Sequence, residues 1–318
     1  MSGDDHAHLE AIADAIREET CVLFLGAGVH APPPVGSTFN YPEDARPPFA
    51  SALSERLARS ARFPHRFPNE GPADLTRVAL FFEHFIGRGM LEDEIQSAVQ
   101  EGKEPSPILH ALAEIGFPIV ITTNYDRLFE TALDAAGRNP SAFVYGVDFG
   151  SPRRRYGSYR SLRNARHGRE RDHYERLLTA HERFHNATAA SPVVLKVHGD
   201  IGHPGTIVVT DEDYIRIANQ IGIVAEYVGL AASETRGWTT LIVGYRMVDF
   251  DFRQIFTLYT DADEDLWRPS SKYAVDPAPD ELLSEIWEED RGVKYIRSNV
   301  WCFVPDLYKL VLGKEMPN

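Results

Sequence analysis

The sequence predicts an α/β protein with a doubly wound, mostly parallel Rossmann-like sheet and a smaller helical subdomain formed by insertions. Two observations predict this fold class. Short apolar runs rich in β-branched residues recur along the chain, as expected of strands buried on both faces, and segments with helical spacing lie between them. The predicted strands are residues 21–26, 118–123, 193–199, 206–211, 239–245, 272–276 and 293–297.

Helices are predicted in most of the intervals between these runs. They occupy residues 9–19, 106–116, 125–137, 211–233 and 280–290. Ser106 is suited to be the N-cap of the second helix, and Gly116 to end it. Thr210 and Asp213 predict a variant of the capping box at the start of the fourth helix.

Two regions interrupt the alternation of strands and helices. Residues 29–105 combine Pro-rich loops with helical pieces, and residues 140–190 contain an Arg-rich stretch followed by a further helical piece. We interpret both regions as insertions that together form the helical subdomain over the sheet edge. The chain, residues 1–318, is therefore predicted to be a single domain.

Composition narrows the class of protein. The chain has 318 residues, of which 43% are hydrophobic, and it has no apolar run of 18 residues that predicts a membrane span. Its acidic, polar N-terminus is unlike a secretory signal. The two cysteines, Cys21 and Cys302, are far apart, which excludes a four-cysteine zinc site and favours the reducing cytoplasm. The net charge of −14 argues against nucleic acid as the main ligand of the whole surface.

One stretch differs from this acidic average. Residues 151–176 contain nine arginines and only three acidic residues. Three interpretations are open: a solvated loop, a contact for the acidic face of a partner protein, or a contact for nucleic-acid phosphates.

A glycine-rich turn follows the first predicted strand. Gly26, Ala27, Gly28 and Ala31 match the G-x-G-x-x-G/A pattern, which lets the backbone approach a pyrophosphate. Three prolines follow at 32–34, so the expected helix does not begin there, and no ribose-binding acid ends a second strand about 20 residues later. These departures disfavour an ordinary dehydrogenase. The alternative is a tight turn without a ligand.

The second predicted strand ends in the letters TTNYD. Asn124 and Asp126 stand where that strand gives way to a helix. One interpretation is structural, because Asn is a good N-cap and Asp in a first turn suits the helix dipole. The other is an amide that holds a ribose hydroxyl or a water, with a carboxylate beside it.

The third predicted strand ends in KVHGD. His198 could be a core histidine bonded to a backbone carbonyl, or a proton acceptor, since its unperturbed pKa near 6.5 suits that task. Gly199 permits a ligand to approach closely. Because parallel strands end at the same edge of a sheet, we expect His198 to lie near Gly28 and Asn124.

The run 239–245 repeats this arrangement. Gly244 and Tyr245 end the strand, and Gly244 leaves room for the adenosine half of a nucleotide. Asp249 and Asp251 follow, and we interpret them as favourable charges at a helix N-terminus.

A literal H-E-x-x-H motif, His181 to His185, raises the possibility of zinc, with Glu182 as base. The segment is charged and Arg-rich, and the sequence offers no evident third ligand. We interpret the motif as a chance match and predict no metal site.

In combination, the four strand-end motifs resemble the sirtuin superfamily and, more closely, the sirtuin-like domain of bacterial anti-phage proteins. The resemblance implies an NAD+ site in which Gly26, Ala27 and Gly28 hold the pyrophosphate. It implies that Asn124 and His198 act at the nicotinamide ribose and that Asp126 lies toward nicotinamide. The chain departs from the family in having no cysteine-paired zinc module. It also has Val29-His30 where the loop usually carries a serine.

The activity implied by the resemblance is NAD+ glycohydrolysis in the cytoplasm, depleting NAD+ in anti-phage defence. NAD+ is then the substrate, and the products are nicotinamide and ADP-ribose or its cyclic form. The resemblance also implies control by homo-oligomerisation or by a separate protein, such as an Argonaute-like protein or a ring ATPase. The alternatives are an NAD+-dependent deacylase or ADP-ribosyltransferase, and a non-catalytic module that senses ADP-ribose-like nucleotides.

Overall fold

The structure is a computed structural model, and it describes residues 3–63, 71–72, 74–144, 177–219, 221–247, 250–262 and 270–317. Within these residues, seven parallel strands form one sheet in the order β3-β4-β2-β1-β5-β6-β7. The strands are β1 (Cys21–Leu25), β2 (Ile119–Thr122), β3 (Ser141–Val144), β4 (Val193–Lys196), β5 (Thr239–Val243), β6 (Lys272–Val275) and β7 (Val293–Ile296). The predicted fold class is confirmed.

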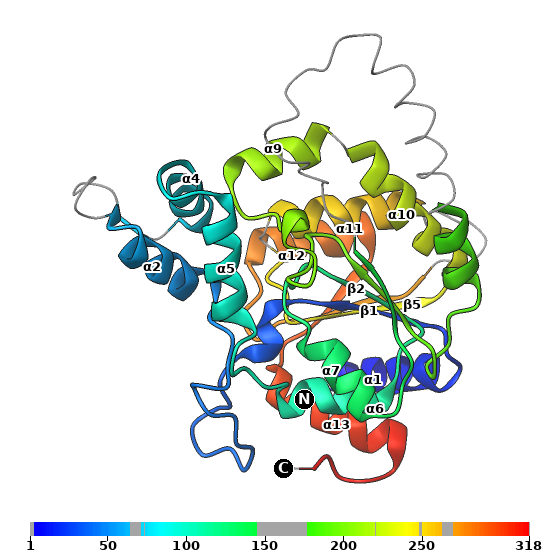
Figure 1. Cartoon of the computed structure of the whole chain (residues 1–318). Coiled ribbons are helices and arrows are strands. Elements are labelled where there is room, and N and C mark those ends of the chain that lie inside the picture. Colours follow the sequence, from blue (N-terminus) through cyan, green and yellow to red (C-terminus); the bar gives the residue numbers. More distant parts are fainter. Residues whose placement is uncertain are drawn as a thin grey trace.

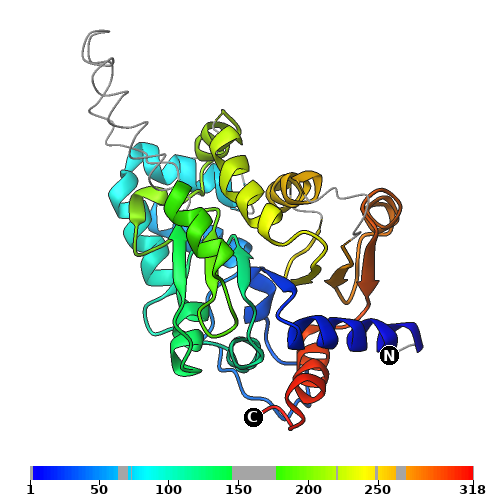
Figure 2. The same cartoon turned by 90° about the vertical axis from the view of Figure 1, so that its right-hand side faces the viewer.

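Helices cover both faces of the sheet (Figures 1 and 2). One face carries α1 (Gly3–Arg17), α6 (Pro107–Ile115), α7 (Leu128–Ala135) and α13 (Val300–Leu312). The other carries α10 (Ile221–Glu234), α11 (Phe250–Ala262), α12 (Glu281–Arg291) and the helical residues 177–185. In β1, Leu23 and Leu25 join the first core while Val22 and Phe24 join the second, as the two-residue period of a strand requires. No helix in the described part of the chain is long and apolar enough to cross a membrane.

Three helices stand beside the sheet and pack around an apolar core of their own (Figure 1). They are α2 (Ala50–Ser60), α4 (Leu75–Phe85) and α5 (Arg88–Val99), and we call them the helical subdomain. The guanidinium of Arg88 attaches the subdomain to the segment after β4. Its Nη1 lies 2.8 Å from Oδ2 of buried Asp213, and its Nη2 donates to the carbonyl of Ile207. Most of the second predicted insertion, 140–190, lies outside the described residues.

The strand predicted at 206–211 is wrong. A short 3-10 turn (Pro204–Thr206) leads instead into an extended loop that pairs with no strand. Ile207 and Val209 are buried against the helical subdomain, and Val208 packs into the core between the sheet and the helices α10, α11 and α12. A short apolar run that is buried as a loop has the same sequence pattern as a buried strand, so the sequence cannot distinguish the two. The edge strand β3, which was not predicted, takes the remaining place in the sheet.

The signals predicted at Ser106, Gly116, Thr210 and Asp213 are confirmed. Ser106 Oγ accepts a hydrogen bond from Leu109 N at 3.1 Å, and Gly116 ends α6 with φ of 85°. Thr210 and Asp213 exchange the hydrogen bonds of a capping box, because Thr210 N donates to Asp213 Oδ2 at 3.0 Å and Asp213 N donates to Thr210 Oγ1 at 3.2 Å. The single helix predicted over 211–233 is divided into α9 (Asp211–Asn219) and α10.

Ser106 links this local cap to the turn after β1, because its buried Oγ also donates to the carbonyl of Val29 at 3.0 Å. We expect Ser106→Ala to lower the free energy of unfolding by about 1–2 kcal/mol, since both the cap and a buried acceptor lose their partner. Urea denaturation measures this change. Ser233→Ala, at an exposed helical serine, is the control. A loss no larger than that of the control would contradict the assigned role.

Candidate active site

The first and fifth strands end in direct contact. Gly26 N donates to Val243 O at 2.9 Å, and Gly28 N donates to Gly244 O at 2.8 Å. A Cβ on Gly26 would stand 2.4 Å from Gly244 O, and one on Gly28 would stand 2.8 Å from the same atom. The two glycines are therefore required for the close approach of β1 and β5. Both of their N–H groups already have carbonyl partners. Of these three turn residues, Ala27 lines the adjoining cavity.

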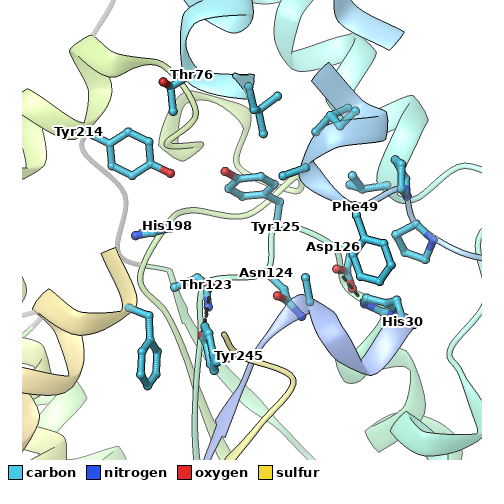
Figure 3. A pocket seen from close by; sticks show the side chains of 18 residues that line it. His30, Phe49, Thr76, Thr123, Asn124, Tyr125, Asp126, His198, Tyr214 and Tyr245 are labelled. Atoms are coloured by element: carbon cyan, nitrogen blue, oxygen red, sulfur yellow. Dashed lines mark hydrogen bonds and ion pairs between the residues drawn. The ribbon is translucent and has the colours of Figure 1, made fainter. Parts of the chain in front are cut away.

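A cavity of about 350 Å³ lies beyond the carboxyl ends of the strands, between the sheet edge and the helical subdomain (Figure 3). This is the switch point of the sheet, because the chain leaves β1 toward β2 on one side and β5 lies on the other. The strand ends contribute Ala27, His30, Thr123, Asn124, Tyr125, Asp126, His198 and Tyr245 to its wall. The opposite wall includes Phe49, Leu53, Leu75, Thr76 and Val99. The cavity thus brings together Ala27, Asn124, Asp126, His198 and Tyr245, all of which were predicted site residues.

His198 is buried, with 6% of its surface exposed, and its ring lies edge-on to Tyr214 at a centroid distance of 5.7 Å. Within the described residues its ring nitrogens form no hydrogen bond, so the alternative of a core histidine bonded to a backbone carbonyl is not what the structure contains. Burial lowers the pKa of His198 from 6.5 to about 4. The imidazole is therefore neutral near pH 7 and retains a free acceptor nitrogen.

Asn124 does not cap the following helix. That helix, α7, begins at Leu128, and its terminal N–H bonds Asp126 Oδ1 at 3.0 Å instead. The backbone N of Asn124 donates to Thr122 Oγ1 at 3.1 Å, which fixes the turn, while its side chain faces the cavity (Figure 3). Its amide has no hydrogen-bond partner in the described part of the chain. The structural interpretation thus fits Asp126 but not Asn124.

Asp126 is paired with a histidine that we did not predict as a site residue. His30 Nε2 lies 3.4 Å from Asp126 Oδ2, and both side chains are buried at the cavity wall. Burial raises the pKa of Asp126. Its interactions with His30, Lys196 and the Leu128 N–H lower the pKa by more than burial raises it, so the net direction is downward. The carboxylate is therefore ionised. The sequence contains one signal for His30 as a site residue, because Val29-His30 stand where the loop of the family usually carries a serine.

The second ring nitrogen of His30 faces a hydroxyl. Tyr41 Oη lies 3.4 Å from His30 Nδ1 and donates its own proton to Glu104 O at 3.0 Å. The hydroxyl can therefore only accept from the ring, which assigns the Nδ1 proton. The ring is anchored on one side by Tyr41 and faces Asp126 on the other.

Lys196, at the end of β4, is fully buried and surrounded by acceptors. Its Nζ lies 2.7 Å from Asp200 Oδ2 and 3.0 Å from Glu130 Oε1, and it donates to the backbone carbonyl of Asp126. Asp200 also pairs with Arg127, whose Nε lies 3.1 Å from Oδ1. One ammonium group thus connects the segments after β2 and β4, which carry Asn124 and His198.

The turn between His198 and Asp200 depends on Gly199. Its φ is +88°, and a Cβ there would stand 2.1 Å from Thr206 O. The glycine thus serves the packing of the loop 200–206 against the strand end. It does not line the cavity, so the predicted approach of a ligand to Gly199 is not supported by its position.

Tyr245 joins the ends of β2 and β5. Its hydroxyl accepts from Thr123 N at 3.0 Å, and its ring packs on Phe252 at a centroid distance of 4.3 Å. Gly244, with φ of +78°, lies beneath the cavity against Gly26 O. Asp249 falls outside the described residues, and Asp251 lies in the first turn of α11.

The H-E-x-x-H motif lies on the helix of residues 177–185 and does not line the cavity. The rings of His181 and His185 stack at 6.3 Å, and both face Glu234, at 3.4 Å and 3.0 Å. No cluster of side chains able to hold a metal is found among the residues that the structure describes. The Arg-rich stretch 151–176 lies outside those residues.

An all-parallel sheet with helices on both faces and a cavity at its switch point defines a Rossmann-like α/β protein. The family model of the SIR2-like domain matches residues 118–296, and the chain belongs to this family. Over 291 residues the chain is 22% identical to defense-associated sirtuin 2 of Bacillus subtilis, covering 91% of this chain and 24% of that protein. Over 207 residues it is 24% identical to the NAD(+) hydrolase ThsA of Acinetobacter baumannii (strain 532279), covering 65% of this chain and 33% of that protein. The chain thus spans about a quarter to a third of the length of these two relatives.

The lowered pKa of His198 predicts a pH dependence of stability. Between about pH 6.5 and 4, His198 is protonated in the unfolded chain but not in the folded protein. Acidification through this range therefore destabilises the folded protein by about 3 kcal/mol. Above pH 6.5 the effect is absent. Urea denaturation at pH 7 and pH 4 should therefore show that His198→Gln is spared this part of the loss. His110→Gln, at an exposed histidine on α6, should behave as wild type. Parallel pH profiles of wild type and His198→Gln would refute the shift.

The buried ammonium group predicts a large loss when it is removed. Lys196→Met removes the cation from partly buried Glu130 and leaves buried Asp200 with exposed Arg127 as its remaining described cation, and we expect the free energy of unfolding to fall by about 3–5 kcal/mol. Chemical denaturation measures the fall, and Lys309→Met, on an exposed lysine, is the matched control. Adding Asp200→Asn and Glu130→Gln to Lys196→Met should recover part of the loss. An unchanged triple variant would argue that lost packing rather than charge is responsible.

Proposed function

We propose that the chain is an NAD+ glycohydrolase, which cleaves the bond between nicotinamide and ribose. The products are nicotinamide and ADP-ribose or its cyclic form. One observation carries the proposal: the neutral imidazole of His198 and the uncommitted amide of Asn124 face one cavity with the ionised carboxylate of Asp126. Membership of the SIR2-like family and the similarity to a protein named NAD(+) hydrolase support it.

The proposed chemistry needs little acid assistance, because nicotinamide leaves as a neutral molecule. The ribose passes through an oxocarbenium-like state, and the site must orient the sugar and one water. A pKa of about 4 makes His198 a weak base. Its role is therefore to accept a hydrogen bond from a ribose hydroxyl or water and polarise it. Asn124 supplies both a donor and an acceptor to orient the same group.

Asp126 supplies a negative charge beside the reacting centre. Its position at the wall suits the family role toward nicotinamide, where a carboxylate accepts the N–H groups of the carboxamide. His30 and Lys196 act through Asp126, because their charges keep its carboxylate ionised. A carboxylate fixed in this way also favours the positive charge that develops on the ribose.

The remaining assignments belong to the same proposal. Gly26, Ala27 and Gly28 form the turn over which the diphosphate lies, and Gly244 and Tyr245 flank the adenosine side. NAD+ depletion in anti-phage defence rests on the similarity to a protein named defense-associated sirtuin. We further propose a single cytoplasmic domain over residues 1–318 without a catalytic metal. Its control would come from homo-oligomerisation or from a separate Argonaute-like or ring-ATPase protein.

The test is NAD+ consumption by the purified chain, with nicotinamide release as the readout. His198→Ala and Asn124→Ala should each lower the rate at least about 100-fold, because each variant loses a positioned hydrogen bond to the reacting ribose or water. His181→Ala, in the H-E-x-x-H motif outside the cavity, should retain full activity, and circular dichroism should show all three variants folded. Undiminished turnover in a folded His198→Ala protein would exclude the assignment.

The same assay separates the alternatives. A deacylase needs an acetylated peptide for nicotinamide release, and an ADP-ribosyltransferase needs an acceptor, whereas the proposed hydrolase needs only water. Nicotinamide release that begins only when acetyl-peptide is added would therefore show that the enzyme is a deacylase and not a hydrolase. Tight binding of ADP-ribose without NAD+ turnover, in the presence or absence of candidate activators, would indicate a sensing module.

A further inference from the structure

A second cavity, of about 360 Å³, adjoins the first. The two cavities share His30 and the residues 47–49, so the Pro-Pro-Phe segment is their common wall. Phe49 from this wall is visible beside His30 and Asp126 in Figure 3. The proposed reaction does not use the second cavity.

The second cavity is strongly basic. Four of its lining residues are cationic, Arg46, Arg56, Arg59 and Lys103, and only Glu43 among the lining residues is acidic. The whole chain, by contrast, carries a net charge of −14. Like charges gathered in one hollow repel one another, so this arrangement lowers stability unless an anion is present.

Among the described residues, the two cations on the loop side have only carbonyl oxygens as hydrogen-bond partners. Arg46 Nε donates to Pro42 O at 3.2 Å, and Lys103 Nζ donates to Asp44 O at 2.8 Å. Neither forms an ion pair with a described residue. Both are half-buried, where charges attract an anion more strongly than on an open surface. Carbonyl contacts orient the side chains without neutralising them.

The same two cations are held next to each other by the backbone. Glu104 N donates to Ala45 O at 3.0 Å, which joins the segment that carries Lys103 to the segment that carries Arg46. Tyr41 adds a second link through its hydrogen bond to Glu104 O. The pair is therefore fixed before any ligand arrives, and binding loses less conformational entropy.

The other two cations of the cavity belong to α2. Arg59 Nε donates to Glu55 O at 3.3 Å and forms no ion pair with a described residue. Arg56 is already neutralised in part by Glu94, with Nε and Oε2 3.1 Å apart, and its Nη2 donates to Ser97. The uncompensated charge thus comes from Arg46 and Lys103 on one side and from Arg59 on the other.

We propose that this second cavity binds the diphosphate group of a small nucleotide-like ligand. Guanidinium and ammonium donors from two sides match the oxygens of two linked phosphates better than a single carboxylate, and the volume lies within the range of small-molecule sites. A ligand there contacts the 47–49 wall, so its presence restrains one side of the proposed NAD+ cavity. The site does not depend on NAD+ cleavage, and its test is a binding measurement.

The probe is inorganic pyrophosphate, titrated calorimetrically into the full chain in a buffer of low ionic strength. The double variant Arg46→Gln/Lys103→Gln should bind at least about tenfold more weakly, since two charge-assisted contacts are lost. Lys309→Gln/Lys314→Gln, which removes two exposed lysines on the C-terminal side, should bind as wild type. Arg59→Gln, at an exposed position, provides a second variant if the double variant is unfolded. Binding that is absent, or that is equal in wild type, the double variant and Arg59→Gln, overturns the proposal.

Competition identifies where the diphosphate comes from. If ADP-ribose displaces pyrophosphate, and Arg46→Gln/Lys103→Gln weakens ADP-ribose binding as well, the cavity holds the diphosphate of the dinucleotide itself, and the placement of that group over the turn of Gly26 to Gly28 is wrong. If ADP binds with the same dependence on Arg46 and Lys103 while ADP-ribose remains bound, the ligand is a separate nucleotide. Either result supports the site, and a protein that binds pyrophosphate but does not turn over NAD+ would refute only the proposed reaction.

Discussion

The buried ammonium group of Lys196 is the interaction on which the site depends. It connects the segment after β2, through the Asp126 carbonyl and Glu130, to the segment after β4, through Asp200. A fully buried charge is tolerated only when it is paired and hydrogen-bonded. The three acceptors therefore have to converge, and their convergence fixes the loops that carry Asn124 and His198. A lysine in an apolar strand, which is otherwise unfavourable, thus determines the geometry of the cavity.

The cavity then places two ionisable groups in different surroundings. Burial alone lowers the pKa of His198, whereas Asp126 has cationic neighbours that outweigh its burial. One side chain is consequently a neutral acceptor and the other a fixed negative charge at the same pH. Such divergence within one cavity is a common feature of catalytic sites. It needs Lys196 and His30 on one side and a nonpolar environment around His198 on the other.

The helical subdomain forms the part of the cavity wall that the sheet does not provide. Arg88 attaches it to Ile207 and Asp213, so the loop after β4 is covered by apolar residues of α2, α4 and α5. The segment after β4 carries His198, and the subdomain supplies Leu53, Leu75 and Val99 to the cavity wall. The insertion is therefore part of the cavity, and residues 47–49 separate that cavity from its basic neighbour.

The sequence alone determined the strands apart from β3, the caps at Ser106 and Thr210, and the clustering of polar residues at strand ends. These features follow from local periodicity, turn chemistry and the rule that parallel strands end at one edge. Only the tertiary structure decided the role of Ile207 to Val209 as a buried loop, the pairing of His30 with Asp126, and the acceptors around Lys196. It also decided that Gly26 and Gly28 serve the contact between β1 and β5. Each of these depends on burial against a distant segment, which leaves no periodic pattern in the residues themselves.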